Sequence, residues 1–374
     1  MAGPVRQAID VQRLERYLCD AVPELRGPIT LGQFGFGQSC PTYLITAHDG
    51  NKLVLRKKPP GEIVSKAAHR VDREYKILSA LQATDVPVPR VYTFCQDDGV
   101  IGTPFYIMEF LDGRIFEDPA IPNVSPQDRS EIWHEAILAL AKLHCVDTEE
   151  VGLENYGSRR DYFHRQIQTF SGIHQGQAAV VDSDTEQAVG EIQGFQKILK
   201  YLLKPSAQPE DRACLVHGDF KIDNLVFHPT ENRVIGILDW EMSTIGHPLS
   251  DIANLLMPFT WLLLRNAAAA VTMTRLSPGS LPGLPTRAQI LERYREYTGY
   301  DAQASLIYGG AFVLMKNCVI LHGMKARVAR NQASSGYAGQ YTMYLDRVVE
   351  LAVRAVEIGE RLLEGGTAKW QGKL

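Results

Sequence analysis

The sequence predicts an α+β protein in two parts: a small antiparallel sheet with one helix at residues 1–111, and a larger, mostly helical part at 112–374. Two observations favour this division. Before residue 112, short β-branched and aromatic runs alternate with Gly, Pro and Asp, a pattern typical of strands and turns. After it, apolar residues recur at three- and four-residue spacing, which indicates amphipathic helices. The chain is long enough for both parts, because domains commonly span about 100–200 residues.

Five short strands are expected in the N-terminal part, at residues 29–34, 42–47, 52–57, 91–95 and 105–110. Between the third and the fourth, Val71, Tyr75, Leu78 and Leu81 share one face of a charged stretch. Ser65 is the expected cap of this stretch, and a Val-Pro-Val-Pro segment ends it. The pattern therefore predicts one helix packed on the sheet.

Helical periodicity dominates the C-terminal part, at residues 129–144, roughly 185–203, 287–297, 305–329 and 339–363. Three short apolar runs interrupt this periodicity, at residues 213–216, 225–227 and 234–238. Polar, loop-like segments separate the three runs. We expect these loops to carry the chemistry.

Composition and charge exclude several classes of protein. The 39 basic and 43 acidic side chains leave a net charge of −4, and 45% of the residues are hydrophobic. Neither a disordered chain nor an electrostatic nucleic-acid binder fits this balance. The six cysteines lie far apart without a C-x-x-C pair, so neither a zinc cluster nor a disulfide framework is indicated.

The sequence also bears on location. Charged residues between Arg6 and Arg16 interrupt the apolar stretch that a signal peptide would need. The longest apolar run, 255–264, contains Pro258 and is far shorter than the roughly 18 residues of a membrane span. We therefore expect a cytoplasmic protein without a membrane span. The final Gly372-Lys373-Leu374 approximates the Ser-Lys-Leu peroxisomal address, so a peroxisomal location is the alternative.

The most informative segment is H-G-D-F-K-I-D-N at 217–224, which places Asn224 five residues after Asp219. Twenty residues after Asp219, the next apolar run ends at Asp239. Two carboxylates and an amide oxygen are hard ligands suited to Mg²⁺, which substrate phosphates usually complete. The pattern points to phosphoryl transfer. A lone Asp in a loop is more often a turn residue, but the full spacing makes coincidence the weaker interpretation.

A glycine-rich segment at 32–39 lies between two predicted strands, which argues against a Rossmann or Walker loop and favours a flap over phosphates. The candidate nucleotide contacts in this segment are Gly35, Gly37, Gln38 and Ser39. Glycines in a hairpin also serve the turn itself, and that alternative stays open.

A cation and its orienting carboxylate follow in chain order. Arg56 and Lys57 end the third predicted strand, and Glu74 lies on the next helix. Adjacent strand residues face opposite sides, so only one of the two cations can face the nucleotide. We favour Arg56 because it shares a face with Val54. In the last strand, backbone groups near Glu109 could bond an adenine edge, although an ordinary buried edge strand is equally compatible.

These motifs resemble those of the aminoglycoside phosphotransferase family, which has the two-lobed protein-kinase-like fold and includes choline and fructosamine kinases as relatives. The resemblance extends from about residue 28 to 365 and includes I-L-D-W-E at 237–241 and H-P-L-S-D-I-A at 247–253. The runs G-Q-S-C-P-T-Y-L, L-R-K-K-P-P-G and V-D-R-E-Y-K-I-L are most similar to the kinase-like domain that some proteins fuse to an acyl-CoA dehydrogenase.

The resemblance implies that the protein uses ATP and Mg²⁺ to phosphorylate a hydroxyl of a small molecule. It implies that Asp219 is the catalytic base, that Asn224 and Asp239 bind Mg²⁺, and that Arg56 with Glu74 clamps the nucleotide.

The remaining roles are those of supporting residues. Lys221 would meet the γ-phosphate, and His217 would support the loop. Asp251 would tie the loop backbone from the following helix, and His144 would be a hydrogen-bonded core histidine.

The acceptor pocket is expected in the helical part. Between Leu255 and Gln289 there is no Asp or Glu, whereas an aminoglycoside pocket needs acids to meet its ammonium groups. One helix carries several basic residues, which suit an acyl-CoA phosphate or, alternatively, form a solvated face: Lys316, His322, Lys325, Arg327 and Arg330. By analogy to the relatives that are fused to a dehydrogenase, we therefore rank a hydroxyacyl-CoA or hydroxy acid above an aminoglycoside. A choline-type amine, which would need an aromatic cage with carboxylates, stays open as an alternative.

Two rival classes are disfavoured. A non-catalytic nucleotide-binding scaffold would have lost one of Asp219, Asn224 or Asp239. A protein kinase would need room for a long activation loop between Asp239 and Asp251. Oligomeric state is not readable from the sequence.

Overall fold

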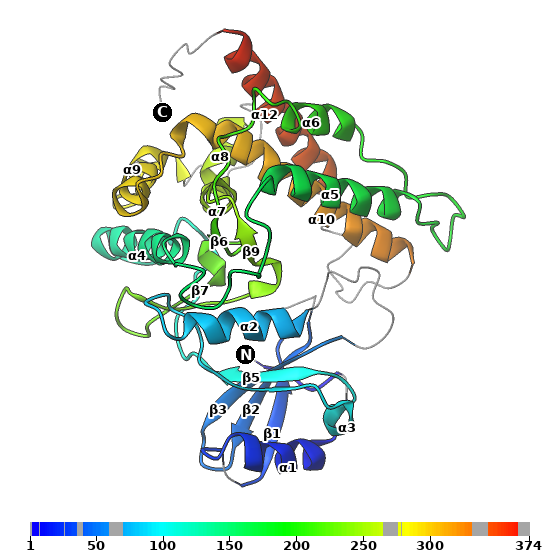
Figure 1. Ribbon diagram of the computed structural model, residues 1–374, viewed down its shortest axis with the longest axis vertical. Helices are drawn as coiled ribbons and strands as arrows, with labels where there is room; N and C mark the ends of the chain where they lie inside the picture. Colours follow the sequence, from blue (N-terminus) through cyan, green and yellow to red (C-terminus); the bar gives the residue numbers. More distant parts are fainter. Residues whose placement is uncertain are drawn as a thin grey trace. The chain divides into compact units, whose positions relative to one another are not determined.

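The computed structural model describes residues 2–6, 8–25, 27–35, 40–59, 70–264, 276–277, 279–330 and 343–365 (Figure 1). The chain divides into two compact units. The first consists of Met1–Ile115, Asp147–Glu154 and Asn224–Ser243, and the second of Phe116–Val146, Asn155–Asp223 and Thr244–Leu374. The predicted fold class, an antiparallel sheet at the N-terminal end and a helical C-terminal region, is confirmed.

The first unit is built on a five-stranded antiparallel sheet in the order β1-β2-β3-β5-β4. Its strands are β1 (Ile29–Gln33), β2 (Thr42–Ala47), β3 (Lys52–Lys57), β4 (Val91–Cys95) and β5 (Phe105–Glu109). All five match the predicted runs, because β-branched and aromatic residues between turn residues are a local signal.

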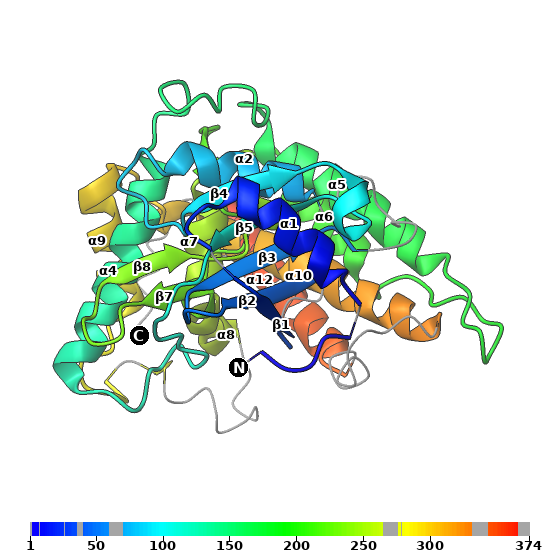
Figure 2. The ribbon, with the colours of Figure 1, turned by 90° about the horizontal axis from the view of Figure 1, so that it is seen from below.

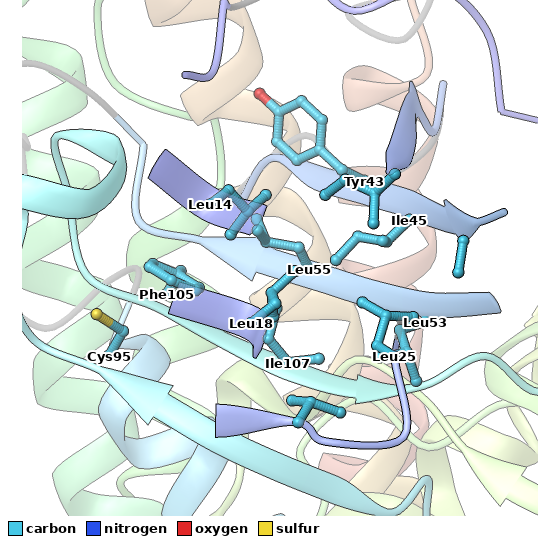
Figure 3. Packing of buried hydrophobic residues seen from close by; sticks show 13 residues of the cluster. Leu14, Leu18, Leu25, Tyr43, Ile45, Leu53, Leu55, Cys95, Phe105 and Ile107 are labelled. Atoms are coloured by element: carbon cyan, nitrogen blue, oxygen red, sulfur yellow. The ribbon is translucent and has the colours of Figure 1, made fainter. Parts of the chain in front are cut away.

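One face of this sheet packs against α1 (Val11–Ala21), which lies across the strands (Figure 2). Asp10 caps the helix by accepting a hydrogen bond from the Arg13 amide. Leu14 and Leu18 are buried against strand residues such as Leu55, as Figure 3 shows. Helix α1 was not predicted from the sequence, because its narrow apolar stripe lies among charged residues.

The opposite face carries α2 (Val71–Leu81), the predicted helix. Alternation along β3 and β5 places Arg56 and Tyr106 on this face, where both contact Glu74 of α2. The expected cap, Ser65, lies outside the described residues, as does the C-terminal Gly-Lys-Leu.

A short hairpin completes the first unit. It pairs β7 (Leu225–Phe227) with β8 (Val234–Ile237), and Trp240–Met242 forms a 3-10 turn against α2. The short helix α3 (Asp98–Ile101) precedes β5. The two predicted metal ligands, Asn224 and Asp239, lie at one end of the hairpin.

The second unit is mostly helical. Its helices are α4 (Pro126–His144), α5 (Tyr162–Ala178), α6 (Phe195–Leu202), α7 (Leu249–Leu255), α8 (Met257–Leu264), α9 (Arg287–Thr298), α10 (Leu306–Ala329) and α12 (Leu345–Glu364). A short sheet pairs β6 (Cys214–Val216) with β9 (Thr244–Gly246). Helix α10 is central, since α5, α6, α7, α8 and α12 all pack on it.

One helix prediction in this unit was wrong, and one helix was missed. Helix α6 begins at Phe195 and not near residue 185, because Gly190 and Gly194 adopt left-handed backbone angles that interrupt the helix. Helix α5 was not predicted, although its buried residues Phe163, Ile167 and Phe170 recur at helical spacing.

One helix is long and apolar enough to cross a membrane by length and composition, namely Gln303–Ala329, which includes α10. No other helix in the described part of the chain meets this criterion. In its most apolar window, 67% is buried inside the protein. That burial is typical of a core helix, which passes the same test.

Candidate functional site

Residues 217–223, called the catalytic loop for their predicted role, follow β6 in the second unit. Gly218 has φ of 85°, a left-handed conformation that favours glycine. Asp251 of α7 is completely buried and accepts hydrogen bonds from the amides of His217, at 2.6 Å, and Gly218, at 2.8 Å. The predicted tie between Asp251 and the loop backbone is therefore confirmed.

A second layer of hydrogen bonds supports Asp251. The Nε2 atom of His144 lies 3.2 Å from its carboxylate, and Nδ1 of His144 lies 2.6 Å from the Tyr294 hydroxyl. Burial alone would raise the pKa of Asp251, but His144 and His217 outweigh it, so the pKa is lowered and the carboxylate stays ionised. His144 is the hydrogen-bonded core histidine that the sequence predicted.

Asp219 lies at the centre of the loop. Its Oδ1 accepts a hydrogen bond from the Asn254 amide at 3.2 Å and lies 3.8 Å from Lys316 Nζ. Its Oδ2 lies 3.6 Å from Lys221 Nζ, and its side chain is 29% exposed. The carboxylate is thus fixed through one oxygen, while the other faces an exposed lysine.

Two other predicted loop residues contact Asp219 in the structure. The buried ring of His217 accepts a hydrogen bond from the Asp219 amide at 3.2 Å, which fits a supporting role. Lys221 also pairs with Asp223 at 3.2 Å, and 41% of its side chain is exposed. A contact with a γ-phosphate remains a prediction for Lys221.

In the first unit, Arg56 joins three carboxylates. Its Nε lies 2.7 Å from Glu74, and its Nη2 lies 3.0 Å from Asp239 and 3.7 Å from Glu241. Burial opposes the charge of Arg56, but Glu74 and Asp239 raise its pKa well above the ordinary value. Lys57 instead faces the opposite side of β3, with Nζ 5.9 Å from the Tyr43 ring.

Glu74 is almost completely buried and accepts a hydrogen bond from the Tyr106 hydroxyl at 3.0 Å. Burial raises its pKa, while Arg56 and Tyr106 oppose that rise. Arg56 and Tyr106 therefore hold the Glu74 carboxylate in one orientation.

Asn224 and Asp239 lie at the same end of the β7–β8 hairpin. Leu225 pairs with Ile237, and the Leu238 amide donates a hydrogen bond to the Asn224 carbonyl at 2.8 Å. Asp239 has φ of 67°, a strained conformation that costs a non-glycine residue about 1–3 kcal/mol and that concentrates at functional sites.

The residues at this end of the hairpin fit a hard divalent cation. Asn224, Asp239 and Glu241 offer oxygen donors, and three carboxylates around Arg56 exceed its single positive charge. A sulfur-containing alternative brings the ligand atoms of Cys40, Glu74 and Glu241 within 4.8 Å of one another. Burial raises the pKa of the Cys40 thiol to about 12, so it stays protonated and is a poor ligand.

Of the remaining predicted nucleotide contacts, the structure describes only Gly35 and Glu109. Gly37, Gln38 and Ser39 lie outside the described residues, and a Cβ placed on Gly35 would meet nothing within 4 Å. Glu109 accepts a hydrogen bond from the Arg90 amide at 3.1 Å, a bond between the ends of β4 and β5. A role in nucleotide binding remains a prediction for all of them.

The basic helix predicted for the acceptor is only partly exposed. Lys316 and His322 face the interior of the second unit, whereas Lys325, Arg327 and Arg330 are exposed. His322 is hydrogen-bonded to the Gly190 carbonyl at 2.9 Å. The prediction that Lys316 and His322 belong to a surface for an acyl-CoA phosphate was wrong, because both groups are engaged inside the protein.

A cavity of about 680 Å³ lies elsewhere in the second unit, between the segment before α6 and helices α10 and α12. Its lining contains four acids and four lysines or arginines, so its charge selects neither anions nor cations. None of the catalytic-loop residues lines it. The cavity therefore does not identify the acceptor.

Asn254 was not predicted as a site residue, although its spacing from Asp251 is a signal in the sequence. Asn254 lies three residues after Asp251, about one turn along α7, so both side chains lie on the same side of the helix. Both bond the catalytic loop, since the Asn254 amide also donates to the Phe220 carbonyl at 3.1 Å.

Comparison with known proteins relates the chain to one protein family. The profile of the phosphotransferase enzyme family matches residues 30–285. Acyl-CoA dehydrogenase family member 11 of Rattus norvegicus is 38% identical over 300 residues, 78% of this chain and 36% of that protein. Acyl-CoA dehydrogenase family member 10 of Mus musculus is 36% identical over 357 residues, 93% of this chain and 31% of that protein. The chain thus spans about a third of the length of these two relatives.

A solved structure gives a match over nearly the whole chain. The crystal structure of a candidate aminoglycoside phosphotransferase from Ralstonia eutropha is similar with a TM-score of 0.76 and 32% identity. The match covers 94% of this chain and 99% of that one.

Proposed function

This chain belongs to the phosphotransferase enzyme family, and we propose that it is a kinase that transfers the γ-phosphate of Mg·ATP to a hydroxyl of a small molecule. The family predicted from the motifs is confirmed by the profile and by the solved structure. The observation that carries the proposal is Asp219, held through one carboxylate oxygen by Asn254 in a loop whose backbone Asp251 ties down.

In this proposal, Asp219 accepts the proton of the acceptor hydroxyl. The hydroxyl oxygen forms a bond to the γ-phosphorus while the bond between that phosphorus and the β,γ-bridging oxygen breaks, and ADP leaves. Such a transfer needs positioning and charge stabilisation more than covalent catalysis. Lys221, which is exposed beside Asp219, would place a positive charge near the transferring group.

The first unit would bind the nucleotide. Asn224 and Asp239 would hold Mg²⁺, which when bound would neutralise phosphate charge. A guanidinium such as that of Arg56 can bond phosphate oxygens as well as carboxylates. Glu74, 2.7 Å from Arg56 Nε, fixes its orientation. The current pairing of Arg56 with Asp239 shows that the guanidinium reaches the predicted metal ligand.

For the acceptor we propose a hydroxyacyl-CoA or a hydroxy acid. The support is the similarity to two acyl-CoA dehydrogenase family members, in which sequence related to this chain forms about a third of a longer protein. The lack of acids between Leu255 and Gln289 also argues against an aminoglycoside.

A panel of acceptors tests both parts of the proposal. Purified protein with Mg·ATP is offered hydroxyacyl-CoAs, free hydroxy acids, aminoglycosides and choline, and ADP release is followed beside mass spectrometry of each acceptor. We expect a phosphorylated hydroxyacyl-CoA or hydroxy acid with the wild type, and about 10²–10⁴-fold slower formation of that product with Asp219→Asn. Phosphorylation of a hydroxyl on an aminoglycoside or on choline would overturn the proposed acceptor class. ATP binding without any product would favour a non-catalytic scaffold.

A further inference from the structure

Helix α10 carries a lysine in the middle of its apolar core-facing stretch. Lys316 follows Ala311–Met315, all of which are buried, and only 5% of its own side chain is exposed. A buried ammonium is costly unless oxygen atoms surround it. The position of Lys316 therefore requires an explanation in terms of its partners.

Within the described part of the chain, the oxygen atoms that contact the Lys316 ammonium belong to the catalytic loop or to α7. Its Nζ donates to the Gly218 carbonyl at 2.7 Å and to Asn254 Oδ1 at 3.2 Å. The same atom lies 3.8 Å from Asp219 Oδ1. One ammonium group thus contacts the backbone of the loop, the side chain that orients the proposed base, and the base itself.

The donors of Lys316 determine which way the Asn254 amide points. A lysine only donates hydrogen bonds, so Asn254 must present its oxygen to Lys316. Its nitrogen then faces Asp219 Oδ1 at 3.2 Å and the Phe220 carbonyl at 3.1 Å. In the flipped orientation the amide oxygen would face the carboxylate of Asp219, and the two would repel.

Charge balance supports the same arrangement. Asp219 and Asp251 bring two carboxylates to the loop, and Lys221 is the exposed cation on the side of Asp219 Oδ2. Burial lowers the pKa of Lys316, but Asp219 and Asp251 oppose that lowering. The buried Lys316 lies near Oδ1 of Asp219, whereas the exposed Lys221 lies near Oδ2.

We propose that Lys316 is a positioning residue for phosphoryl transfer: it fixes the Asn254 amide and the Gly218 carbonyl so that Asp219 presents Oδ2 to the acceptor hydroxyl. This inference rests on the function proposed above. Lys316 lies on α10 and acts on the catalytic loop, so it is not part of a surface that binds the acceptor.

The first test separates turnover from binding. Lys316→Met keeps the length of the side chain and removes its donors, so the turnover number should fall about tenfold to hundredfold while the KM for Mg·ATP stays within about twofold. Asn254→Leu should have a similar effect, and the double variant should be no worse than either single one, because both act through one chain of contacts. Lys142→Met, the same change at an exposed position on α4, should leave turnover unchanged.

A background lacking the base distinguishes positioning from general damage. In an Asp219→Asn protein, Lys316→Met should leave the residual turnover unchanged, because the carboxylate that it orients is already gone. If Lys316→Met lowered turnover by the same factor in the wild-type background and in the Asp219→Asn background, or did not lower it at all, the inference would be overturned while the kinase proposal stayed intact.

A second measurement does not depend on activity. Amide hydrogen exchange of a peptide covering residues 214–224 should be about tenfold faster in Lys316→Met than in the wild type, with no change in Lys142→Met. If the wild type proves inactive with every acceptor, the proposed function fails but this test still stands. Unchanged exchange would overturn the inference on its own.

Discussion

Replacing Asp251 by Asn removes the buried charge that holds the start of the catalytic loop. Asp251 accepts hydrogen bonds from two backbone amides and from His144, and it is completely buried. A hydrogen bond to a charged group contributes roughly 1.5–3 kcal/mol. The asparagine nitrogen cannot accept, so at least one of the three bonds is lost and the others become neutral. Because breaking a buried charged network costs about 3–5 kcal/mol, we expect a loss of that size in the free energy of unfolding at pH 7.

The dependence on pH has a definite sign. The pKa of Asp251 is lowered in the folded protein, so its contribution is present above the ordinary carboxyl pKa of about 4 and is lost as the pH falls through the folded value. The gap in stability between wild type and Asp251→Asn should therefore be widest at neutral pH and should narrow below about pH 4.

Urea unfolding at a series of pH values measures this gap. Asp184→Asn is a matched control at an exposed position, and it should change stability by less than about 0.5 kcal/mol. A gap below about 1 kcal/mol for Asp251→Asn, or one that is independent of pH, would refute the reasoning.

Three other predictions concern the proposed active site. Asp219→Asn should lower turnover by about 10²–10⁴-fold while calorimetry shows unchanged affinity for Mg·ATP; loss of nucleotide binding would contradict the role of Asp219 as a base. Arg56→Met should raise the KM for Mg·ATP by about tenfold or more, whereas Lys57→Met, on the opposite face of β3, should leave it within about twofold; equal effects would remove the basis for choosing Arg56. Because the Cys40 thiol is buried and its pKa is raised to about 12, iodoacetamide at pH 8 should leave it unmodified in the folded protein, as peptide mass spectrometry would show; rapid alkylation would contradict that environment.

The parts of the structure that could be predicted from the sequence have local signals. All five strands of the large sheet in the first unit followed from β-branched runs between turn residues. The choice of Arg56 over Lys57 followed from the two-residue period of a strand, and the structure pairs Arg56 with Glu74. The contact between Asp251 and the loop backbone was also predicted, from its place in a motif.

The parts that could not be predicted depend on tertiary packing. A lysine on a helix ordinarily lies in solvent, and nothing near Lys316 in the sequence shows that it bonds Gly218, 98 residues earlier. The role of Asn254 could not be predicted for the same reason, because its partner Asp219 lies on a loop 35 residues away. Helix α1 was missed for a different reason, since only Leu14 and Leu18 are buried in a stretch rich in charge.

In the proposed function, Asp219 enables transfer of a phosphoryl group from ATP to a hydroxyl. ³¹P NMR of the wild type and of Asp219→Asn, each with Mg·ATP and a hydroxyacyl-CoA, tests this role. We expect a new phosphoester resonance that grows as the γ-phosphate signal of ATP declines, and that grows about 10²–10⁴-fold more slowly with Asp219→Asn. A phosphoester formed equally fast by both proteins would contradict it.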